Sequence, residues 1–433
     1  MNPTQSASRT CPRTCHQRAI TTSTGHPPQG SALTNSDPHY REHPHEILDE
    51  IRSAGPAFKD ELFQRWIVTN HDTAQRLFKN TAACGKNWEM ASEGTWGKTV
   101  SARKGKFGMV DADGEEHQRL RNTAANAFSA TFTASLQPEL ERIADELIDR
   151  ILGLPQFDFI DSIAAPYPNR VMAAVLGITK EDEEKFKRWC EEWALICDPG
   201  ISPEQHHIAI VASGSLHAYF SEIASARSKE PKDDFISRLV HNGNKNSHSD
   251  DRLSSAEIAV ICMQLIIAGN ITLTDVMGNG LVALLHHPEQ MDKLRYRHDL
   301  MDKAIEEILR FDPPASEIHR FCREDIQLEE LTIRKGQTIT SNIAGCNHDP
   351  ATYVLPHQFD IERTGASHVS FGGGPHRCLG ARLARMEIKV VFQKLLEAFP
   401  LLKLTQDALE RKPAPTFNGY KKIMITTRWL LPE

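Results

Sequence analysis

The amino-acid sequence predicts a mainly α-helical fold with small β-sheets. From about residue 40 onward, apolar residues recur every three or four positions, which is the spacing of one face of an α-helix. Strand-like runs are fewer and shorter, and the sequence contains no internal repeat. With 433 residues, of which 40% are hydrophobic, the chain is long enough to bury a sizeable core.

Nine segments have the helical spacing, and four shorter runs indicate strands. The helices are expected at residues 43–53, 72–79, 114–128, 134–151, 180–193, 203–227, 255–286, 289–311 and 381–397. The strands are expected at residues 56–69, 325–333, 337–343 and 421–429. The longest helix follows Ser254-Ser-Ala-Glu257, a sequence typical of a capping box. The 289–311 helix should end at Asp312-Pro313-Pro314, and the polar stretch 241–252 is expected to be a loop.

The N-terminal segment differs in composition from the rest of the chain. It is rich in Ser, Thr, Pro and Arg, nearly free of bulky apolar side chains, and its first acidic residue is Asp37. Such a segment buries too little surface to order itself, so residues 1–37 are predicted as a disordered tail and 38–433 as one domain. An Arg- and Ser-rich leader without acids is also typical of an organelle transit peptide, and that alternative stays open. Cys11 and Cys15 lie here and are interpreted as solvated thiols.

Charge and hydropathy argue against several classes of partner. The net charge is −7, so no basic field exists to hold nucleic acid or an anionic membrane. The most apolar stretch, Ile258–Leu285, is interrupted by polar and acidic residues, so no membrane span is expected. Nine scattered cysteines with no paired spacing favour a reducing cytoplasm over a disulfide scaffold.

Histidine is frequent, but the spacing of the histidines matches no metal-binding motif. The pairs His206-His207 and His286-His287 are adjacent, so two members of a pair cannot face one ligand on a helix. No His-Glu-x-x-His motif is present, and zinc is not expected.

The strongest chemical signal is Phe371-Gly-Gly-Gly-Pro-His-Arg-Cys-Leu-Gly380, which precedes a predicted helix. Three glycines let the backbone approach a bulky group. The helix dipole and the neighbours His376 and Arg377 should favour the thiolate of Cys378, which could act as a nucleophile or an axial iron ligand. A phosphate loop is disfavoured because the Gly-Lys-Ser/Thr ending is absent, whereas a lone cysteine could also be a small core residue.

The spacing Phe-x-x-Gly-x-His/Arg-x-Cys-x-Gly resembles the haem-ligand loop of the cytochromes P450. The resemblance covers roughly residues 38–433. It implies the cytochrome P450 fold, with haem b between a long oxygen-binding helix and this loop. Cys378 would be the proximal thiolate ligand, with Phe371 and Gly372 beside the cofactor.

A second resemblance lies in Glu307-Ile-Leu-Arg310, an acid and a base on one helix face. Alone, this pair is more simply explained as a surface ion pair. In the family, a Glu-x-x-Arg helix and a later arginine form a buried network behind the ligand loop. The segment Phe359-Asp-Ile-Glu-Arg363 resembles the source of that arginine. Glu307, Arg310 and Arg363 are therefore expected to have structural roles.

The segment Ala268-Gly-Asn-Ile-Thr-Leu-Thr-Asp275 on the long helix resembles the family's oxygen-binding helix. Gly269 would let a flat macrocycle or small ligand approach, although a packing glycine in a buried helix is the simpler alternative. In the family, the hydroxyl matched by Thr272 positions water and contacts iron-bound dioxygen. The usual acid before it is replaced here by Ile271, so proton delivery must differ. Asn270, Thr274 and Asp275 are the candidates.

Four side chains match the family's contacts to the haem propionates. His117 and Arg121 are four residues apart on one predicted helix, Arg320 resembles the family's strand arginine, and His376 precedes the ligand by two residues. The arginine fork suits bidentate contact with a carboxylate. Judged singly, each could equally be a solvated polar residue.

The resemblance implies a monooxygenase that inserts one oxygen atom from O2 into a small, largely apolar organic substrate. Electrons would come from NAD(P)H through a reductase and a ferredoxin, with Arg377, Arg382 and Arg385 offering positive charge for docking. Glu317 is expected near the pocket, bonded to local backbone in preference to a basic substrate. The alternatives are oxidative coupling, desaturation, peroxide-driven chemistry, or a non-catalytic haem sensor. The retained Thr272 argues against peroxide use.

Overall fold

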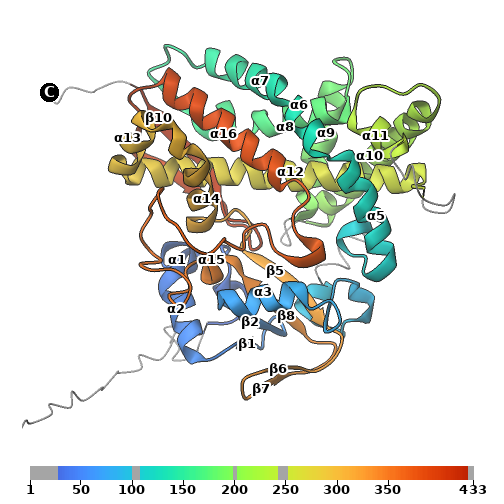
Figure 1. Cartoon of the computed structure of the whole chain (residues 1–433), viewed down its shortest axis with the longest axis vertical. Helices are drawn as coiled ribbons and strands as arrows, with labels where there is room; N and C mark the ends of the chain where they lie inside the picture. The colour runs from blue at the N-terminus through green and yellow to red at the C-terminus, as the bar shows by residue number, and fades with distance from the viewer. Residues whose placement is uncertain (1–27, 100–107, 198–201, 242–251, 428–433) are drawn as a thin grey trace, which may run out of the picture.

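The computed structural model describes residues 28–99, 108–197, 202–241 and 252–427 (Figure 1). Its α-helices are α1 (Pro38–Glu42), α2 (Pro44–Ala54), α3 (His71–Lys79), α5 (Gly114–Ala127), α6 (Ala130–Ser135), α7 (Gln137–Asp149), α8 (Pro166–Leu176), α9 (Glu183–Ala194), α10 (Pro203–Lys229), α11 (Phe235–His241), α12 (Ser255–His286), α13 (Pro288–Tyr296), α14 (Met301–Phe311), α15 (Ile343–Asn347) and α16 (Ala381–Ala398). Its strands are β1 (Phe58–Asp60), β2 (Arg65–Val68), β3 (Cys84–Gly85), β4 (Gln156–Asp158), β5 (Glu317–Cys322), β6 (Ile326–Leu328), β7 (Leu331–Ile333), β8 (Thr338–Asn342), β9 (Lys403–Arg411) and β10 (Tyr420–Thr426). The predicted mainly α-helical class with small sheets is confirmed.

The helix α12 is the centre of the helical part and crosses it from side to side in Figure 1. The predicted capping box starts it: the Glu257 amide donates to Ser254 Oγ over 3.2 Å, and the Ser254 amide donates to the Glu257 carboxylate over 2.7 Å. Helices α8, α10, α14 and α16 pack against it. Among the described helices, α12 alone has the length and apolar composition to cross a membrane, and here it is the core helix of the fold.

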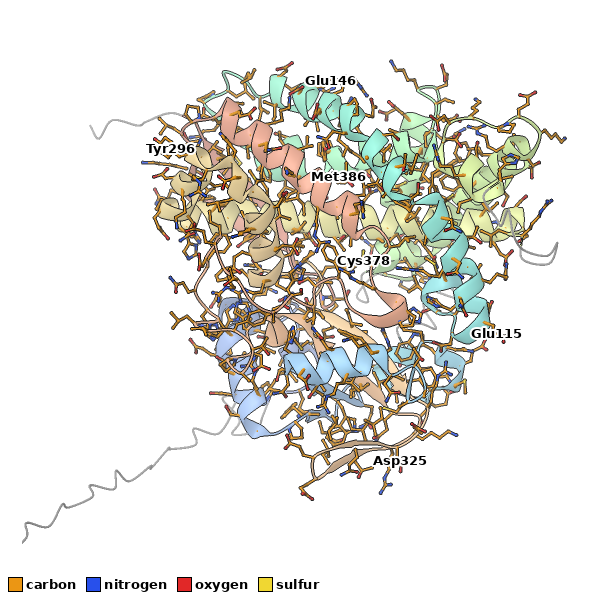
Figure 2. All side chains as sticks on the ribbon, viewed as in Figure 1. Glu115, Glu146, Tyr296, Asp325, Cys378 and Met386 are labelled. Atoms are coloured by element: carbon orange, nitrogen blue, oxygen red, sulfur yellow. The ribbon has the colours of Figure 1, made fainter. Side chains whose placement is uncertain are left out.

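The large sheet and the β6–β7 pair lie below the helices in Figure 1, whereas β10 lies beside them. The large sheet has the strand order β1-β2-β8-β5-β3, in which only β2 and β8 run parallel. A three-stranded sheet has the order β4-β10-β9, and β6 pairs with β7. The loop that carries Cys378 lies between the helical part and the large sheet (Figure 2).

Several boundaries differ from those predicted. The expected helix 289–311 is two helices, α13 and α14, because the chain leaves helical geometry at Arg297, whose guanidinium binds Asp299 at 2.7 and 2.8 Å. The expected strand 56–69 is the hairpin β1–β2, which turns at Gln64 with a φ of 47°. Helix α8 and strands β5 and β9 were not among the predicted elements.

The folded part begins before the predicted boundary at residue 38. Residues 30–33 form a 3-10 turn, and Leu33 is buried against α2 residues such as Leu48. The side-chain amide of Asn35 donates to Ser316 Oγ and to the Phe417 carbonyl, each over 2.9 Å. Residues 1–27, with Cys11 and Cys15, and most of the expected loop 241–252 lie outside the described residues.

Candidate active site

The segment from Phe371 to Cys378 forms a closed loop that leads into α16. The Cys378 amide donates to the Phe371 carbonyl over 2.9 Å, so the first and last residues of the motif meet. Gly372 and Gly374 have φ values of +63° and +62°, which L side chains rarely adopt. A Cβ on Gly374 would lie 2.0 Å from the Phe78 carbonyl oxygen of α3. The glycines therefore permit both the turn and its close contact with α3.

The thiol at the end of this loop is accessible although it lies near the middle of the molecule (Figure 2). Of the cysteines whose side chains the structure describes, Cys378 alone is exposed. The dense protein around the loop raises the pKa of this thiol, against the lowering effects of the Gly380 amide, Arg121 and two further arginines. The amide at the helix terminus and the nearby arginines thus favour the thiolate as expected, but desolvation outweighs them in the protein alone. A bound metal ion would supply the missing charge, since a coordinated thiol is deprotonated.

Basic side chains from α5 and from the loop itself gather around Cys378. The rings of His117 on α5 and His376 have centroids 4.0 Å apart. The Arg121 Nη2 atom donates to the Arg377 carbonyl over 2.5 Å, which places this guanidinium beside Cys378. The structure therefore brings three of the four predicted propionate contacts together at the cysteine loop.

Arg320 on β5 is the fourth of these contacts and is buried. Its guanidinium donates to the His319 carbonyl, and in the described part of the chain no carboxylate forms an ion pair with it. Burial lowers the pKa of Arg320 to about 10. A buried cation without an anionic partner is unfavourable, so this position fits an anionic group of a ligand.

His117 is in a similar position. Its Nε2 atom is buried without a hydrogen-bond partner in the described structure. Burial, followed by His376 and Arg121, lowers the pKa of His117 to about 4, so the ring is neutral near pH 7. A neutral imidazole can donate its one N–H to a carboxylate.

Asp113 lies close to His376, and it was not among the residues predicted from the sequence. One carboxylate oxygen lies 3.6 Å from His376 Nε2, and the other is 2.8 Å from the Arg323 Nη2 atom. Although burial works to raise it, the pKa of Asp113 is held below its usual range by bonds from His376, the amides of Asn87 and Lys86, and Arg323. Its place directly before the predicted helix that carries His117 was the available signal.

These residues fit haem in the kind of groups they offer. An accessible thiol provides the soft axial ligand, while Arg121, Arg320, His117 and His376 provide donors for two propionates. The glycines keep the loop backbone free of side chains. The donor set therefore suits haem b bound through a thiolate ligand.

Helix α12 contains a short stretch that is less buried than the residues before and after it along the chain. Ala268 is exposed and residues 269–272 are half-buried, whereas residues 273–284 are buried. The Thr272 hydroxyl donates to the Ala268 carbonyl over 2.6 Å. A Cβ on Gly269 would lie 3.1 Å from Met172 Sδ, so packing against α8 explains this glycine. The simpler of the two alternatives for Gly269 therefore accounts for it.

The three candidates for proton delivery all have partners inside the protein. Asn270 donates to Asn169 on α8, and the Thr274 hydroxyl donates to the Asn270 carbonyl. Asp275 is completely buried, and one of its oxygens lies 2.7 Å from Lys412 Nζ. One carboxylate oxygen of this candidate is therefore directed at the β9–β10 turn.

The expected network behind the ligand loop is confirmed. The Glu307 carboxylate accepts from Arg310 Nε and Nη2 at 2.7 and 2.8 Å, and from Arg363 Nε at 3.1 Å. Glu307 and Arg310 are buried. Arg310 also donates to the carbonyls of Asn347 and Pro356, each over 2.9 Å. The network thus ties α14 to the segment that follows α15.

Two other expectations are wrong. Glu317 is not bonded to local backbone: its carboxylate pairs with Arg65 Nη1 at 2.5 Å inside the large sheet, and Arg65 also pairs with Asp60. Arg385 is not a free surface charge, because it forms two bonds to Glu306 at 2.5 and 2.8 Å. Long-range partners that local sequence cannot reveal explain both.

The chain is similar to known proteins over most of its length. Residues 33–426 match the family described as Cytochrome P450. The "Biotin biosynthesis cytochrome P450" of Bacillus subtilis is 30% identical over 397 residues, covering 91% of this chain and 99% of the relative. The "Vitamin D(3) 25-hydroxylase" of Pseudonocardia autotrophica is 30% identical, with coverage of 89% and 94%.

Solved structures are similar over the same range. P450BioI in complex with hexadec-9Z-enoic acid ligated acyl carrier protein has a TM-score of 0.81 at 29% identity, covering 90% of this chain and 99% of that one. The Bacillus subtilis polyketide synthase cytochrome P450 PksS has a TM-score of 0.82 at 27% identity, with coverage of 91% and 99%. Fold, ligand loop and relatives agree, and the chain belongs to the cytochrome P450 family of haem-thiolate monooxygenases.

Proposed function

We propose that this enzyme inserts one oxygen atom of O2 into a small, largely apolar organic substrate, with hydroxylation as the main outcome. Haem supplies the oxygen-activating chemistry when bound, and its thiolate ligand favours O–O cleavage. The observation that carries the proposal is the more open stretch of α12 from Ala268 to Thr272, which is followed by the continuously buried residues 273–284. A reactant can approach the helix there.

The side chains around this stretch favour an apolar substrate. Leu265, Ile267 and Ile271 are partly exposed on α12 and offer no charge. Ile318 of β5 lies near the ligand loop, since a Cβ on Gly372 would be 3.3 Å from Ile318 Cδ1. Such a lining excludes water and orients a hydrocarbon by shape.

Thr272 is the one hydroxyl of this stretch that we assign to proton handling. Because it donates to the Ala268 carbonyl, its oxygen lone pairs remain available to accept from a water. Ile271 cannot carry a proton, and Asp275 is held by Lys412. Water ordered by Thr272 would therefore replace the acid usual in the family.

Electrons would reach the haem from NAD(P)H through a reductase and an acidic ferredoxin, in the cytoplasm. Arg377 and Arg382 are exposed next to the ligand loop and provide positive charge for docking. Arg385 is removed from this surface by its pair with Glu306.

The experiment uses haem-loaded enzyme with NADPH, a ferredoxin reductase and a ferredoxin. A panel is first screened for substrate-induced high-spin shifts. It contains a sterol and a long-chain fatty acid, the latter free and carrier-protein-linked, because these resemble the compounds in the relatives' names. The best ligand is then turned over under 18O2, and one labelled oxygen atom in the product supports the proposal. A desaturated or coupled product without label would favour the atypical reactions, and binding without turnover a sensor.

A further inference from the structure

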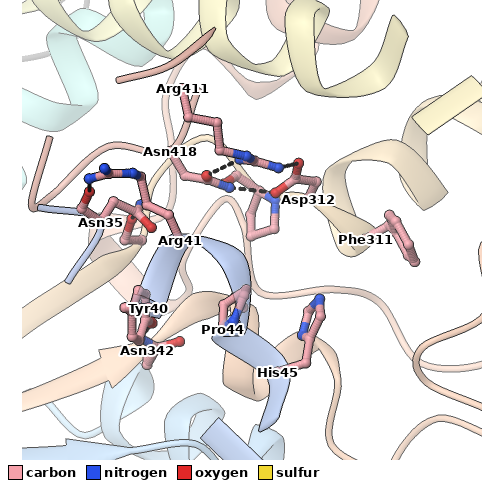
Figure 3. A pocket seen from close by; sticks show the side chains of 13 residues that line it. Asn35, Tyr40, Arg41, Pro44, His45, Phe311, Asp312, Asn342, Arg411 and Asn418 are labelled. Carbon is pink, nitrogen blue, oxygen red and sulfur yellow. Dashed lines mark hydrogen bonds and ion pairs between the residues drawn. The ribbon is translucent and has the colours of Figure 1, made fainter. Parts of the chain in front are cut away.

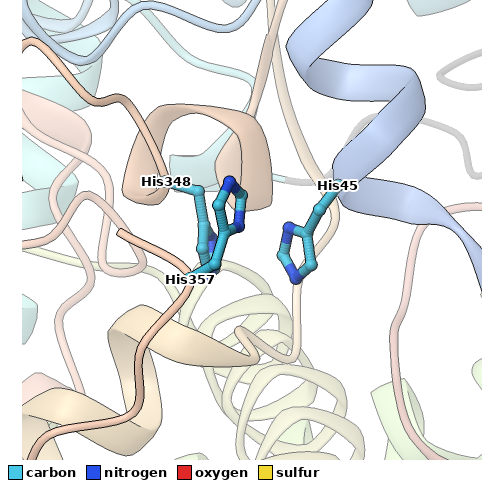
Figure 4. A group of neighbouring side chains, drawn as sticks. All are labelled: His45, His348 and His357. Atoms are coloured by element: carbon cyan, nitrogen blue, oxygen red, sulfur yellow. The ribbon is translucent and has the colours of Figure 1, made fainter. Parts of the chain in front are cut away.

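Three histidines that are distant in the sequence meet next to the Glu307 network (Figure 4). His45 lies on α2, His348 directly follows α15, and His357 lies in the loop that leads to the Arg363 segment. One ring nitrogen of each lies within 4.8 Å of the other two. His348 is buried, His45 half-buried and His357 exposed, so the cluster is reachable from solvent on one side.

Two of these rings carry buried nitrogens without a partner. His45 Nδ1 and His348 Nε2 form no hydrogen bond in the described structure, and the His348 residue is only 1% exposed. The other nitrogen of His348, Nδ1, lies 2.9 Å from the Ala344 carbonyl oxygen. A carbonyl only accepts, so Nδ1 carries the proton and Nε2 bears a lone pair. Buried nitrogens of this kind need a partner, and a metal ion provides one.

His357 is oriented by a carboxylate. Its Nε2 atom lies 3.0 Å from Asp49 Oδ2, which accepts the proton and leaves Nδ1 free to ligate. Asp49 is itself held by Arg52. Carboxylates that fix a ligating histidine in this way are a common outer layer of protein metal sites.

Ligation requires neutral imidazoles, and burial favours that form at the two inner rings, because His348 is buried and His45 is half-buried. Three neutral imidazoles suit a borderline-soft divalent ion such as Zn²⁺.

We propose that His45, His348 and His357 bind one Zn²⁺ ion, at a site separate from the haem. In a tetrahedral site with Zn–N distances near 2.0–2.1 Å, ligand nitrogens are about 3.4 Å apart, so the rings would move closer together when the ion binds. His45 also lines a cavity of about 120 Å³ between α2 and Asp312, so solvent reaches this side of the cluster (Figure 3). The ion would link α2 to the segment from Asn347 to His357, which Arg310 also binds.

Histidine spacing in the sequence did not predict this zinc site. Only chain folding brings the three residues together, and none belongs to the adjacent pairs that the sequence displays. His348 also occupies the second place of Asn347-His-Asp-Pro350, where the family pattern has arginine. An imidazole there can ligate a metal ion, which a guanidinium cannot.

The test measures metal content in untagged holoenzyme. All proteins carry Cys11→Ser and Cys15→Ser, so that these thiols do not bind zinc. After chelator treatment and dialysis against buffered Zn²⁺, elemental analysis gives zinc per haem iron. We expect one equivalent in the parent and in the control His207→Ala, which alters an exposed histidine on α10. His357→Ala and His45→Gln should each lose that equivalent.

Two further measurements separate binding from folding. Asp49→Asn should keep the site but weaken its Zn²⁺ affinity about 10–100-fold, since it removes only the orienting carboxylate. Zn²⁺ should raise the Tm of the parent and of His207→Ala, but not that of His357→Ala. His357 is exposed, so its loss should leave the haem spectrum and the fold intact. A parent without zinc, or equal zinc in parent and His357→Ala, would overturn the proposal.

Discussion

The Lys412 ammonium nitrogen lies 2.7 Å from Asp275 Oδ1, and this pair joins the core helix α12 to the turn between β9 and β10. Asp275 is completely buried, whereas the Lys412 side chain is 29% exposed. A Cβ on Gly419 would lie 2.1 Å from the same carboxylate oxygen, so the turn packs directly on this acid. The pair therefore sets where the turn meets α12.

Replacing Lys412 by methionine should leave a buried carboxylate without its partner. Burial already raises the pKa of Asp275, and Lys412 opposes this effect. We expect Lys412→Met to lower the free energy of unfolding by about 1–3 kcal/mol at pH 7, measured by urea denaturation. Because the raised pKa penalises the ionised acid, the loss should grow as pH rises above the unfolded value near 4 and shrink in acid.

The double variant Lys412→Met/Asp275→Asn is the control. Without the buried charge, most of the lost stability should return and the pH dependence should disappear. If the double variant is as unstable as the single one, the ion pair is not the cause.

Removing the charge of Glu307 should lower the free energy of unfolding far more than removing the charge of its neighbour Glu306 on the same helix. In Glu307→Gln, two guanidinium groups lose their buried carboxylate, and we expect a loss of about 3–5 kcal/mol. The control Glu306→Gln breaks a partly exposed pair with Arg385 and should cost less than about 1 kcal/mol. Denaturant midpoints of both holoproteins check this. Equal losses would contradict the structural role of the network.

Glu387 on α16 is a buried carboxyl whose pKa is raised well above its usual value by burial. Such a group contributes stability when protonated, and this contribution is lost as pH rises from the unfolded value near 4.3 toward the raised folded value. Glu387→Gln should therefore have a Tm that falls less between pH 5 and pH 8 than that of the parent. Parallel Tm curves for parent and variant would show that Glu387 does not titrate in this way.

The sequence was sufficient where short-range pattern determines structure, and insufficient where distant residues do. The capping box at Ser254 and Glu257 is local and was predicted correctly. Helix α8 was not predicted because Pro166 and Pro168 interrupt its pattern, although proline is compatible with a first helical turn. The burial of charged Glu317 in β5 depends on Arg65, far away in the chain.

In the candidate site too, the features with a local motif could be predicted and those that depend on distant residues could not. The haem-ligand loop and the Glu307 network could be anticipated because each has a fixed motif. The pairing of Asp275 with Lys412 has no motif, since it depends on how the β9–β10 turn packs on α12. The raised pKa of the Cys378 thiol likewise reflects three-dimensional burial, which outweighs the helix terminus visible in the sequence.

Arg320 offers the clearest test of the cofactor site, because it is buried and has no carboxylate partner in the described part of the chain. In Arg320→Leu, a propionate would lose a charge-assisted hydrogen bond, and the haem affinity should fall roughly 10–100-fold, equivalent to about 1.5–3 kcal/mol. The apoprotein should be as stable as the parent or more stable, since an unpaired buried cation has been removed. A residue that merely supported the fold would lower apoprotein stability when it is replaced.

Haem transfer to a scavenger globin and urea denaturation of the apoprotein measure the two effects separately. Arg334→Leu, which removes an exposed arginine paired with Asp325, is the matched control and should change neither. Unchanged haem affinity in Arg320→Leu would remove this residue from the cofactor site.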